Sequence, residues 1–403
     1  MAMTLLATVI YLLGIEGIVS LFGSERLLGT PLSTWSAALS PFRAIAVAVG
    51  DLEATRILGV APGWACLLLL SSASLACLVF AAVKLRAWNP RGEPLQVSEW
   101  ERPVGQSAPT RRRHREVWDN PVLWREVRTK AYGARPIIIK LGYFLIFSML
   151  VAGFWLANPN QADPDIRWLV ARALLPASIL GLLLLNTQAV TAITSERDLK
   201  GIDLLLVTDL TPKEFIFGKL AGIFYNAKEM LVLPIMGMIA CAAGGFMGPA
   251  ALVYTSILLL VFAAFSAVLG IHAGMRYDNT RIALANSLGT MFLLFVGILI
   301  CLFLILISGR FEAQWASFIL FIVLGSIALW VSLSANAPTS AIGLAAAITP
   351  FATFYCVIAF LMGDQTGPFL VGGGVYGFAV LALLIPLVSE FDVATGRTTA
   401  GEG

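Results

Sequence analysis

The chain has 403 residues, of which 58% are hydrophobic and 13% charged, and its formal net charge is +3. Its mean hydropathy of +0.85 excludes an ordinary soluble globular protein, because apolar runs recur from one end of the chain to the other. The five cysteines are scattered within those runs without Cys-x-x-Cys spacing, so the sequence predicts neither a disulfide framework nor a metal site.

Ten apolar stretches approach or exceed the roughly 20 residues that a helix needs to cross a bilayer. They are residues 4–22, 63–83, 137–157, 168–190, 229–246, 249–272, 287–308, 314–335, 341–362 and 369–388. Backbone polar groups in lipid must be satisfied internally, which favours helices. The sequence therefore predicts an all-α, polytopic helical membrane protein with about 8–10 transmembrane helices plus amphipathic interfacial helices.

A short helix signal near the start of the chain recurs near its end. A Ser/Thr-Pro-Phe start and a Gly-Asp end bound residues 40–51 and again 349–364, and a long apolar span follows each. Ser40 and Pro41 predict the N-cap and first residue of a helix over 39–50 that is too short to span. Either this segment or 341–362 could be re-entrant. The match suggests an internal repeat, with 1–88 as a partial membrane unit and 137–390 as a complete one; chance similarity is the alternative.

A polar linker separates these two units. Residues 84–136 contain twelve basic and six acidic side chains, a surplus of six positive charges. Loops rich in Lys and Arg stay on the cytoplasmic side of a membrane, so the linker is predicted to be cytoplasmic, as is the polar tail 391–403. The basic run 111–115 lies next to a membrane span, and we expect it to meet anionic lipid headgroups rather than nucleic acid.

The end of the linker, within residues 89–136, predicts an amphipathic elbow helix lying along the membrane surface. Asn120 is a favourable N-cap and Pro121 a favourable first helical residue. Aromatic and apolar side chains would anchor the helix while its bases reach lipid headgroups. The candidate residues of this surface are Asn120, Pro121, Trp124, Arg125, Glu126 and Arg128.

A charged island, residues 193–222, lies between two long apolar runs. Within it, Thr211 is a predicted N-cap, Pro212 the first helical residue and Glu214 the N3 residue of a capping box. A loop that only joins two spans does not need a capped helix of its own. The island therefore predicts a short amphipathic helix over 211–220 at the membrane surface, where it docks a soluble partner. A solvated interfacial loop is the alternative.

Two motifs in this order resemble ABC-2 type transporter permeases. The sequence NPVLWRE at 120–126, followed by bases, is similar to the amphipathic helix that precedes the first span of those permeases. The sequence SERD at 195–198, a leucine-rich stretch, TPKE at 211–214 and GKL at 218–220 together resemble their first cytoplasmic loop. The chain departs from the family at Ile202 and Asp203, which replace a Thr and a shifted Glu, so the detailed contacts of the motif differ.

The resemblance implies that this loop contacts a separate ABC ATPase subunit that binds MgATP, while this chain binds no cofactor. The chain contains no Gly-x4-Gly-Lys-Ser/Thr phosphate loop and no zinc-protease or serine-hydrolase motif, so ATP hydrolysis is expected in the partner and no enzyme activity in this chain. By motif position, the contact residues are Glu196, Arg197, Asp203, Thr211, Pro212, Lys213, Glu214, Gly218 and Lys219.

The same resemblance implies a permease subunit of the inner or plasma membrane, assembled as a homodimer or heterodimer and surrounded by membrane lipids. It would export a hydrophobic or lipid-linked substrate by alternating access. A secondary transporter or channel is one alternative, although the spans of 137–390 are nearly free of mid-membrane charge, and Lys228 and Glu229 are expected to pair at a helix end. A non-transporting scaffold derived from a permease is the other.

Overall fold

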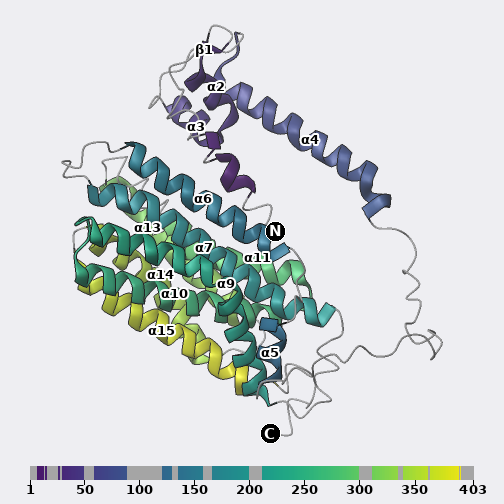
Figure 1. Ribbon diagram of the computed structural model, residues 1–403, viewed down its shortest axis with the longest axis vertical. Coiled ribbons are helices and arrows are strands. Elements are labelled where there is room, and N and C mark those ends of the chain that lie inside the picture. The colour runs from purple at the N-terminus through teal and green to yellow at the C-terminus, as the bar shows by residue number, and fades with distance from the viewer. Residues whose placement is uncertain are drawn as a thin grey trace, which may run out of the picture. The chain divides into compact units, whose positions relative to one another are not determined.

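The computed structural model describes residues 7–12, 14–15, 26–27, 30–49, 59–88, 120–128, 135–157, 166–198, 211–298, 311–334, 339–361, 364–389 and 391. The chain forms two compact units, residues 7–116 and residues 1–6 with 117–403, and the division falls in the predicted linker. The described residues are almost entirely helical (Figure 1). Seven of their helices are long and apolar enough to cross a membrane. The protein is an all-α, polytopic membrane protein, as the sequence predicts.

Besides the helical residues 7–12 and 14–15, the unit of residues 7–116 contains a minimal antiparallel hairpin and three further described helices. The hairpin pairs β1 (Arg26–Leu27) with β2 (Thr30–Pro31), and α2 (Leu32–Leu39), α3 (Pro41–Val49) and α4 (Pro62–Trp88) follow. Helix α3 begins at Pro41 as predicted, and its 9 residues cover only about 14 Å, less than half of a bilayer core. Helix α4 has 27 residues and is long enough to span.

The second unit contains the remaining helices. In chain order they are α5 (Pro121–Arg128), α6 (Arg135–Ala157), α7 (Ile166–Asp198), α9 (Pro212–Ala243), α10 (Pro249–Arg276), α11 (Thr280–Met291), the π-helix η2 (Phe292–Gly297), α13 (Phe311–Ser334), α14 (Ser340–Leu361) and α15 (Thr366–Ser389). They cover the predicted spans from 137 onward; residues 299–308 of one span lie outside the described residues. Helix α14 runs without a break through Pro350, so the re-entrant alternative for 341–362 is wrong.

Helix α7 forms the centre of this unit. It packs against α6, α9, α10 and α11, and 67% of its apolar window is buried, the largest share among the described spans. It packs extensively against α10, where two glycines one turn apart face it. A Cβ at Gly270 would lie 2.6 Å from the Cβ of Ala189, and one at Gly274 would lie 3.0 Å from the Cβ of Ile193. Small residues at this spacing allow two membrane helices to pack closely.

A buried polar group lies within the same core. The amide of Asn186 on α7 donates to the carbonyl of Ser266 on α10 at 2.9 Å and accepts from the hydroxyl of Ser287 on α11 at 2.9 Å. The hydroxyl of Ser266 in turn donates to the carbonyl of Leu182 at 2.7 Å. These bonds give Asn186, Ser266 and Ser287 hydrogen-bond partners and tie three helices together.

Helix α9 differs from the prediction in its length. The sequence predicts a short helix over 211–220 and a separate span over 229–246, but the structure has one helix from Pro212 to Ala243. No proline or turn signal separates the two segments, and the charges between them are accommodated along the helix. The predicted pairing of Lys228 with Glu229 is also wrong. Glu229 pairs with Lys140 on α6 at 2.9 Å, and Lys228 lies 4.3 Å from the centre of the Tyr225 ring.

Candidate functional site

The candidate site is the end of the bundle where α9 begins, and the first turn of α9 is fixed by a capping box. The hydroxyl of Thr211 accepts a hydrogen bond from the backbone N–H of Glu214, and the carboxylate of Glu214 accepts one from the backbone N–H of Thr211 at 3.0 Å. Pro212 occupies the first helical position. The predicted cap is therefore confirmed in each of its parts.

Helix α5, the predicted elbow helix, is attached to this first turn. Asn120 caps α5, because its side-chain oxygen accepts from the backbone N–H of Leu123 at 2.9 Å. The same side chain donates through its nitrogen to the carbonyl of Glu214 at 2.9 Å. A single asparagine thus caps one helix and holds it against the start of another, 94 residues away along the chain.

Two glycines on α9 bring α5 into close contact. A Cβ at Gly218 would lie 2.8 Å from the side-chain oxygen of Asn120, and one at Gly222 would lie 2.6 Å from the Cβ of Glu126. Any larger side chain at these positions would displace α5. As a result, Val122 and Glu126 of α5 are buried against α9.

The charged side chains of the site form what we call the junction cluster, which consists of the buried Glu126, Glu196 and Lys219 and of Arg125, whose side chain is 44% exposed. The Lys219 Nζ lies 2.5 Å from the Glu126 Oε1 and 2.5 Å from the Glu196 Oε1. Arg125 approaches the same Glu196 oxygen to 2.7 Å. The cluster joins α5, α7 and α9, and its two positive charges balance its two negative ones.

Burial distinguishes the junction cluster from an ordinary surface ion pair. The side chain of Lys219 is 0% exposed, and those of Glu126 and Glu196 are 3% and 7% exposed. The ammonium group also lies 3.4 Å from the carbonyl of Ala192. Such charges are tolerated only while each is paired, so the three helices cannot separate here without leaving a charge unpaired in the interior.

The last turn of α7 makes further links to the neighbouring helices. Arg197 donates to the carbonyl of Gly274 on α10 at 3.0 Å, and Asp198 accepts from the hydroxyl of Thr280 on α11 at 2.9 Å. At the opposite side of the site, the ring of Phe215 on α9 lies 5.3 Å from that of Phe391, beyond the end of α15. The start of α9 is therefore held by contacts to α5, α7 and Phe391.

The predicted partner-contact residues fall into two groups in the structure. Thr211, Lys213 and Glu214 are exposed, Pro212 is half-buried, and Phe217 next to them is an exposed aromatic side chain. Glu196, Gly218 and Lys219 are buried within the protein, and Arg197 is half-buried. Asp203 lies outside the described residues. Only the first group presents side chains that another protein could reach; the second group holds the helices together.

The predicted membrane-surface residues of α5 likewise divide into accessible residues and residues that contact other helices. Pro121 is exposed and Trp124 half-buried, while Asn120, Arg125 and Glu126 make the contacts to α9 and α7 described above. Arg128 is the last residue of α5, and its side chain lies outside the described part. Contact of this helix with lipid headgroups stays a prediction. Its docking on α9 was not predicted, although the two glycines that flank Lys219 were a signal of close helix packing.

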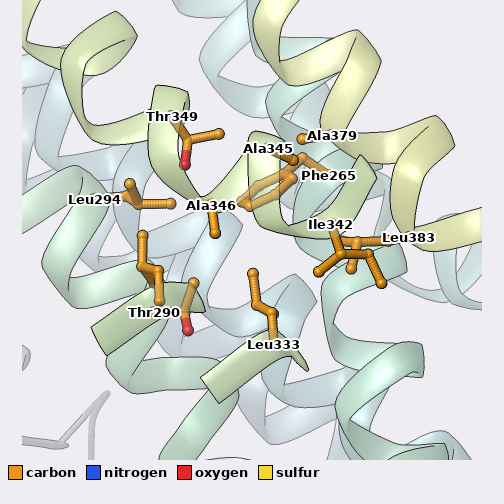
Figure 2. A pocket seen from close by; sticks show the side chains of 11 residues that line it. Phe265, Thr290, Leu294, Leu333, Ile342, Ala345, Ala346, Thr349, Ala379 and Leu383 are labelled. Atoms are coloured by element: carbon orange, nitrogen blue, oxygen red, sulfur yellow. The ribbon is translucent and has the colours of Figure 1, made fainter. Parts of the chain in front are cut away.

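A pocket lies deeper in the same unit, between α10, α11, η2, α13, α14 and α15 (Figure 2). Its walls are apolar apart from two threonines and are formed by Phe265, Thr290, Leu294, Leu329, Leu333, Ile342, Ala345, Ala346, Thr349, Ala379 and Leu383. It has room for about one water molecule. In this arrangement of the helices it therefore cannot hold a substrate. Among the residues that the structure describes, no group of three His, Cys, Asp or Glu side chains is placed to hold a metal ion.

Comparison of the chain with protein-family models, with curated proteins and with solved structures found no match. The interpretation of the site therefore depends on its own geometry and on the two motifs described above.

Proposed function

We propose that the protein is the membrane-spanning permease subunit of an ATP-driven transporter of the ABC-2 type. A separate ATPase subunit, which binds MgATP, docks on the exposed start of α9 at Thr211, Lys213, Glu214 and Phe217. The observation that carries this proposal is the continuity of α9: one helix joins that exposed end to the membrane-spanning segment that ends at Ala243.

The contacts at the start of α9 would allow a displacement caused by the ATPase to be transmitted to the membrane span. A force applied at the exposed end acts on a helix whose first turn is capped and whose next two turns are fixed to α5 and α7 by the junction cluster. Because buried charges resist separation, the three helices move together. Displacement of this end by the ATPase then tilts α7 and α9 as one body, which is the movement that alternating access requires.

The proposal also assigns a side of the membrane to this end of the bundle. The surplus of positive charge in residues 84–136 favours the cytoplasm, and α5 lies within that linker. The ATPase, which depends on cytoplasmic ATP, would meet α9 on the same side. The protein would then lie in the inner or plasma membrane with its basic linker at the lipid headgroups.

The size of the pocket bears on the substrate route. A pocket that holds about one water molecule cannot carry a hydrophobic or lipid-linked substrate through the unit. Under this proposal the route opens by movement of the helices or at the contact between two permease subunits. The small size of this pocket is the observation that favours the second candidate function, a scaffold that holds a partner at the membrane without transporting anything.

A pull-down from detergent extracts of native membranes tests the proposal. The test variant combines Lys213→Glu with Phe217→Asp, which alters two exposed side chains and keeps the capping residues Thr211 and Glu214. The control variant is Gln365→Glu, at an exposed position just before α15. We expect an ATPase subunit to co-purify with the unaltered protein and the control but not with the test variant. If no ATPase co-purifies with the unaltered protein, the proposal is wrong.

Transport distinguishes the permease from the scaffold. Membrane vesicles that contain the protein and its ATPase should export a hydrophobic substrate in an ATP-dependent manner if the protein is a permease. If the ATPase binds but the vesicles show no ATP-dependent export, the scaffold function holds instead.

A further inference from the structure

A proline lies in the apolar half of α9, where it removes a backbone hydrogen bond. Pro234 is buried and has no N–H, so the carbonyl of Met230, one turn earlier, loses the donor that an uninterrupted helix would supply. An unsatisfied carbonyl inside a membrane-spanning bundle is costly. A carbonyl freed in this way is satisfied by a side chain of a neighbouring helix or by ordered water.

Here the partner is the hydroxyl of Tyr143 on α6. Tyr143 is fully buried, and its Oη lies 3.2 Å from the Met230 carbonyl oxygen and 3.1 Å from the Ala177 carbonyl oxygen on α7. A tyrosine hydroxyl carries one hydrogen, which these two carbonyls share. One side chain therefore connects α6 to both α7 and α9 at the level of the proline.

Gly181 on α7 also lies close to the Met230 carbonyl oxygen. A Cβ at Gly181 would lie 2.8 Å from the Met230 carbonyl oxygen and 3.2 Å from the Tyr143 Oη. The carbonyl is backbone and cannot move aside, so only glycine permits this contact. Helices α6, α7 and α9 pack against one another (Figure 1), and the freed carbonyl lies where all three meet.

We propose that Tyr143 is a positioning residue that replaces the donor removed by Pro234 and thereby sets the geometry of α9 relative to α6 and α7. The segment of α9 before Pro234 carries the end at which we place the ATPase. The hydrogen bond of Tyr143 then determines how a displacement of that end reaches the rest of the span. This consequence rests on the proposed function, whereas the pairing of Tyr143 with the freed carbonyl does not.

A double-mutant cycle on the full chain in detergent tests the pairing. Tyr143→Phe removes only the hydroxyl, and Pro234→Ala restores the N–H that the Met230 carbonyl lacks. We expect Tyr143→Phe to lower the apparent Tm by about 2–6 °C, and by less than half as much in the Pro234→Ala background. The matched control is Tyr376→Phe, a fully buried tyrosine bonded to Thr353, whose effect should be the same in both backgrounds.

Two results would overturn the pairing: no loss of stability in Tyr143→Phe, or an equal loss with and without Pro234. If Pro234→Ala does not fold, Pro234→Gly restores the same N–H and completes the cycle. Neither measurement involves the ATPase, so a failed pull-down leaves this test unaffected.

Spin labels test the positioning role in a way that stability alone does not. One label is placed at Phe217 near the start of α9 and one at Ile137 near the start of α6, both exposed, after replacement of the five native cysteines. We expect Tyr143→Phe to shift or broaden the distance distribution when Pro234 is present and to leave it unchanged in Pro234→Ala. If the distributions superimpose in all variants, Tyr143 does not set the geometry of α9.

Discussion

Replacement of Lys219 by methionine should strongly destabilise the protein, and the geometry of the junction cluster gives the magnitude. The Glu126 Oε1 and the Glu196 Oε1 each lie 2.5 Å from the Lys219 Nζ, so these two oxygens are at most 5 Å apart. Without the ammonium group, two buried carboxylates repel each other by about 3 kcal/mol at an effective dielectric constant of about 20. Loss of one partner from a buried ion pair costs about 3–5 kcal/mol, which agrees with this value.

Thermal unfolding in detergent, followed by the intrinsic fluorescence of the chain, measures the effect. For a unit of this size the loss corresponds to a fall in apparent Tm of roughly 6–15 °C. Adding Glu126→Gln to Lys219→Met removes one carboxylate charge and leaves Glu196 paired with Arg125, so the double variant should regain at least half of the loss. Lys228→Met, at an exposed position of the same helix, is the matched control and should change Tm by no more than about 2 °C.

Two outcomes would refute the reasoning. If Lys219→Met unfolds within about 2 °C of the unaltered protein, the ammonium group does not hold the two carboxylates together. If Glu126→Gln fails to restore stability to Lys219→Met, the loss does not come from unpaired negative charge, and packing of the lysine stem against α5 and α7 would explain it instead.

Three further predictions concern single positions. Gly222→Ala should displace α5 and cost about 1–3 kcal/mol in thermal unfolding, whereas Gly374→Ala, with open space around its Cβ position, should be neutral or slightly stabilising; equal effects would contradict the close contact of α5. Asn186→Leu should lower stability by about 0.5–2 kcal/mol through loss of both hydrogen bonds in the core, and an unchanged Tm would show that the neighbouring helices repack without them. Asp364, beyond the end of α14, accepts from the backbone N–H of Gly367 and from Thr366, which lowers its pKa below 3.8. The stability that the ionised Asp364 carboxylate contributes is therefore present above pH 3.8 and is lost as the pH falls through its lowered pKa. Asp364→Asn should accordingly lower Tm at pH 7 and have no effect at a pH below the lowered pKa.

The local features of the site could be predicted from the sequence because their causes are local. A hydroxyl, a proline and a glutamate within four residues are sufficient to form the capping box at Thr211, and the structure has it. Asn120 and Pro121 likewise favour a helix start through the N-cap and first-turn preferences of these two residue types. The spans could be predicted for a similar reason, because length and hydropathy decide whether a helix can lie in lipid.

The contacts between distant segments could not be predicted in this way. Lys219 was expected to contact a partner because of its position in the motif, yet it lies against two carboxylates that come from residues 93 and 23 positions away along the chain. Glu229 was expected to pair with its neighbour in sequence, but Lys140 on another helix is the closer charge. Tyr143 carries no sequence signal at all, since only the fold brings its hydroxyl to the carbonyl that Pro234 frees.

A buried ion cluster is a poor means of adding stability, because well-packed apolar side chains of similar volume are often as good or better. What the cluster contributes is a specific arrangement of the helices that it joins. Apolar surfaces can slide past one another, whereas the Lys219 ammonium fits only where both carboxylates converge on it, and Gly218 and Gly222 allow that approach for α5 alone. The cluster therefore specifies one register among α5, α7 and α9. If α9 transmits force from its exposed end to the membrane span, as proposed, a fixed register prevents α9 from sliding past α5 and α7 instead of moving them. This is the physical reason to expect charge, rather than a larger apolar core, at the start of α9.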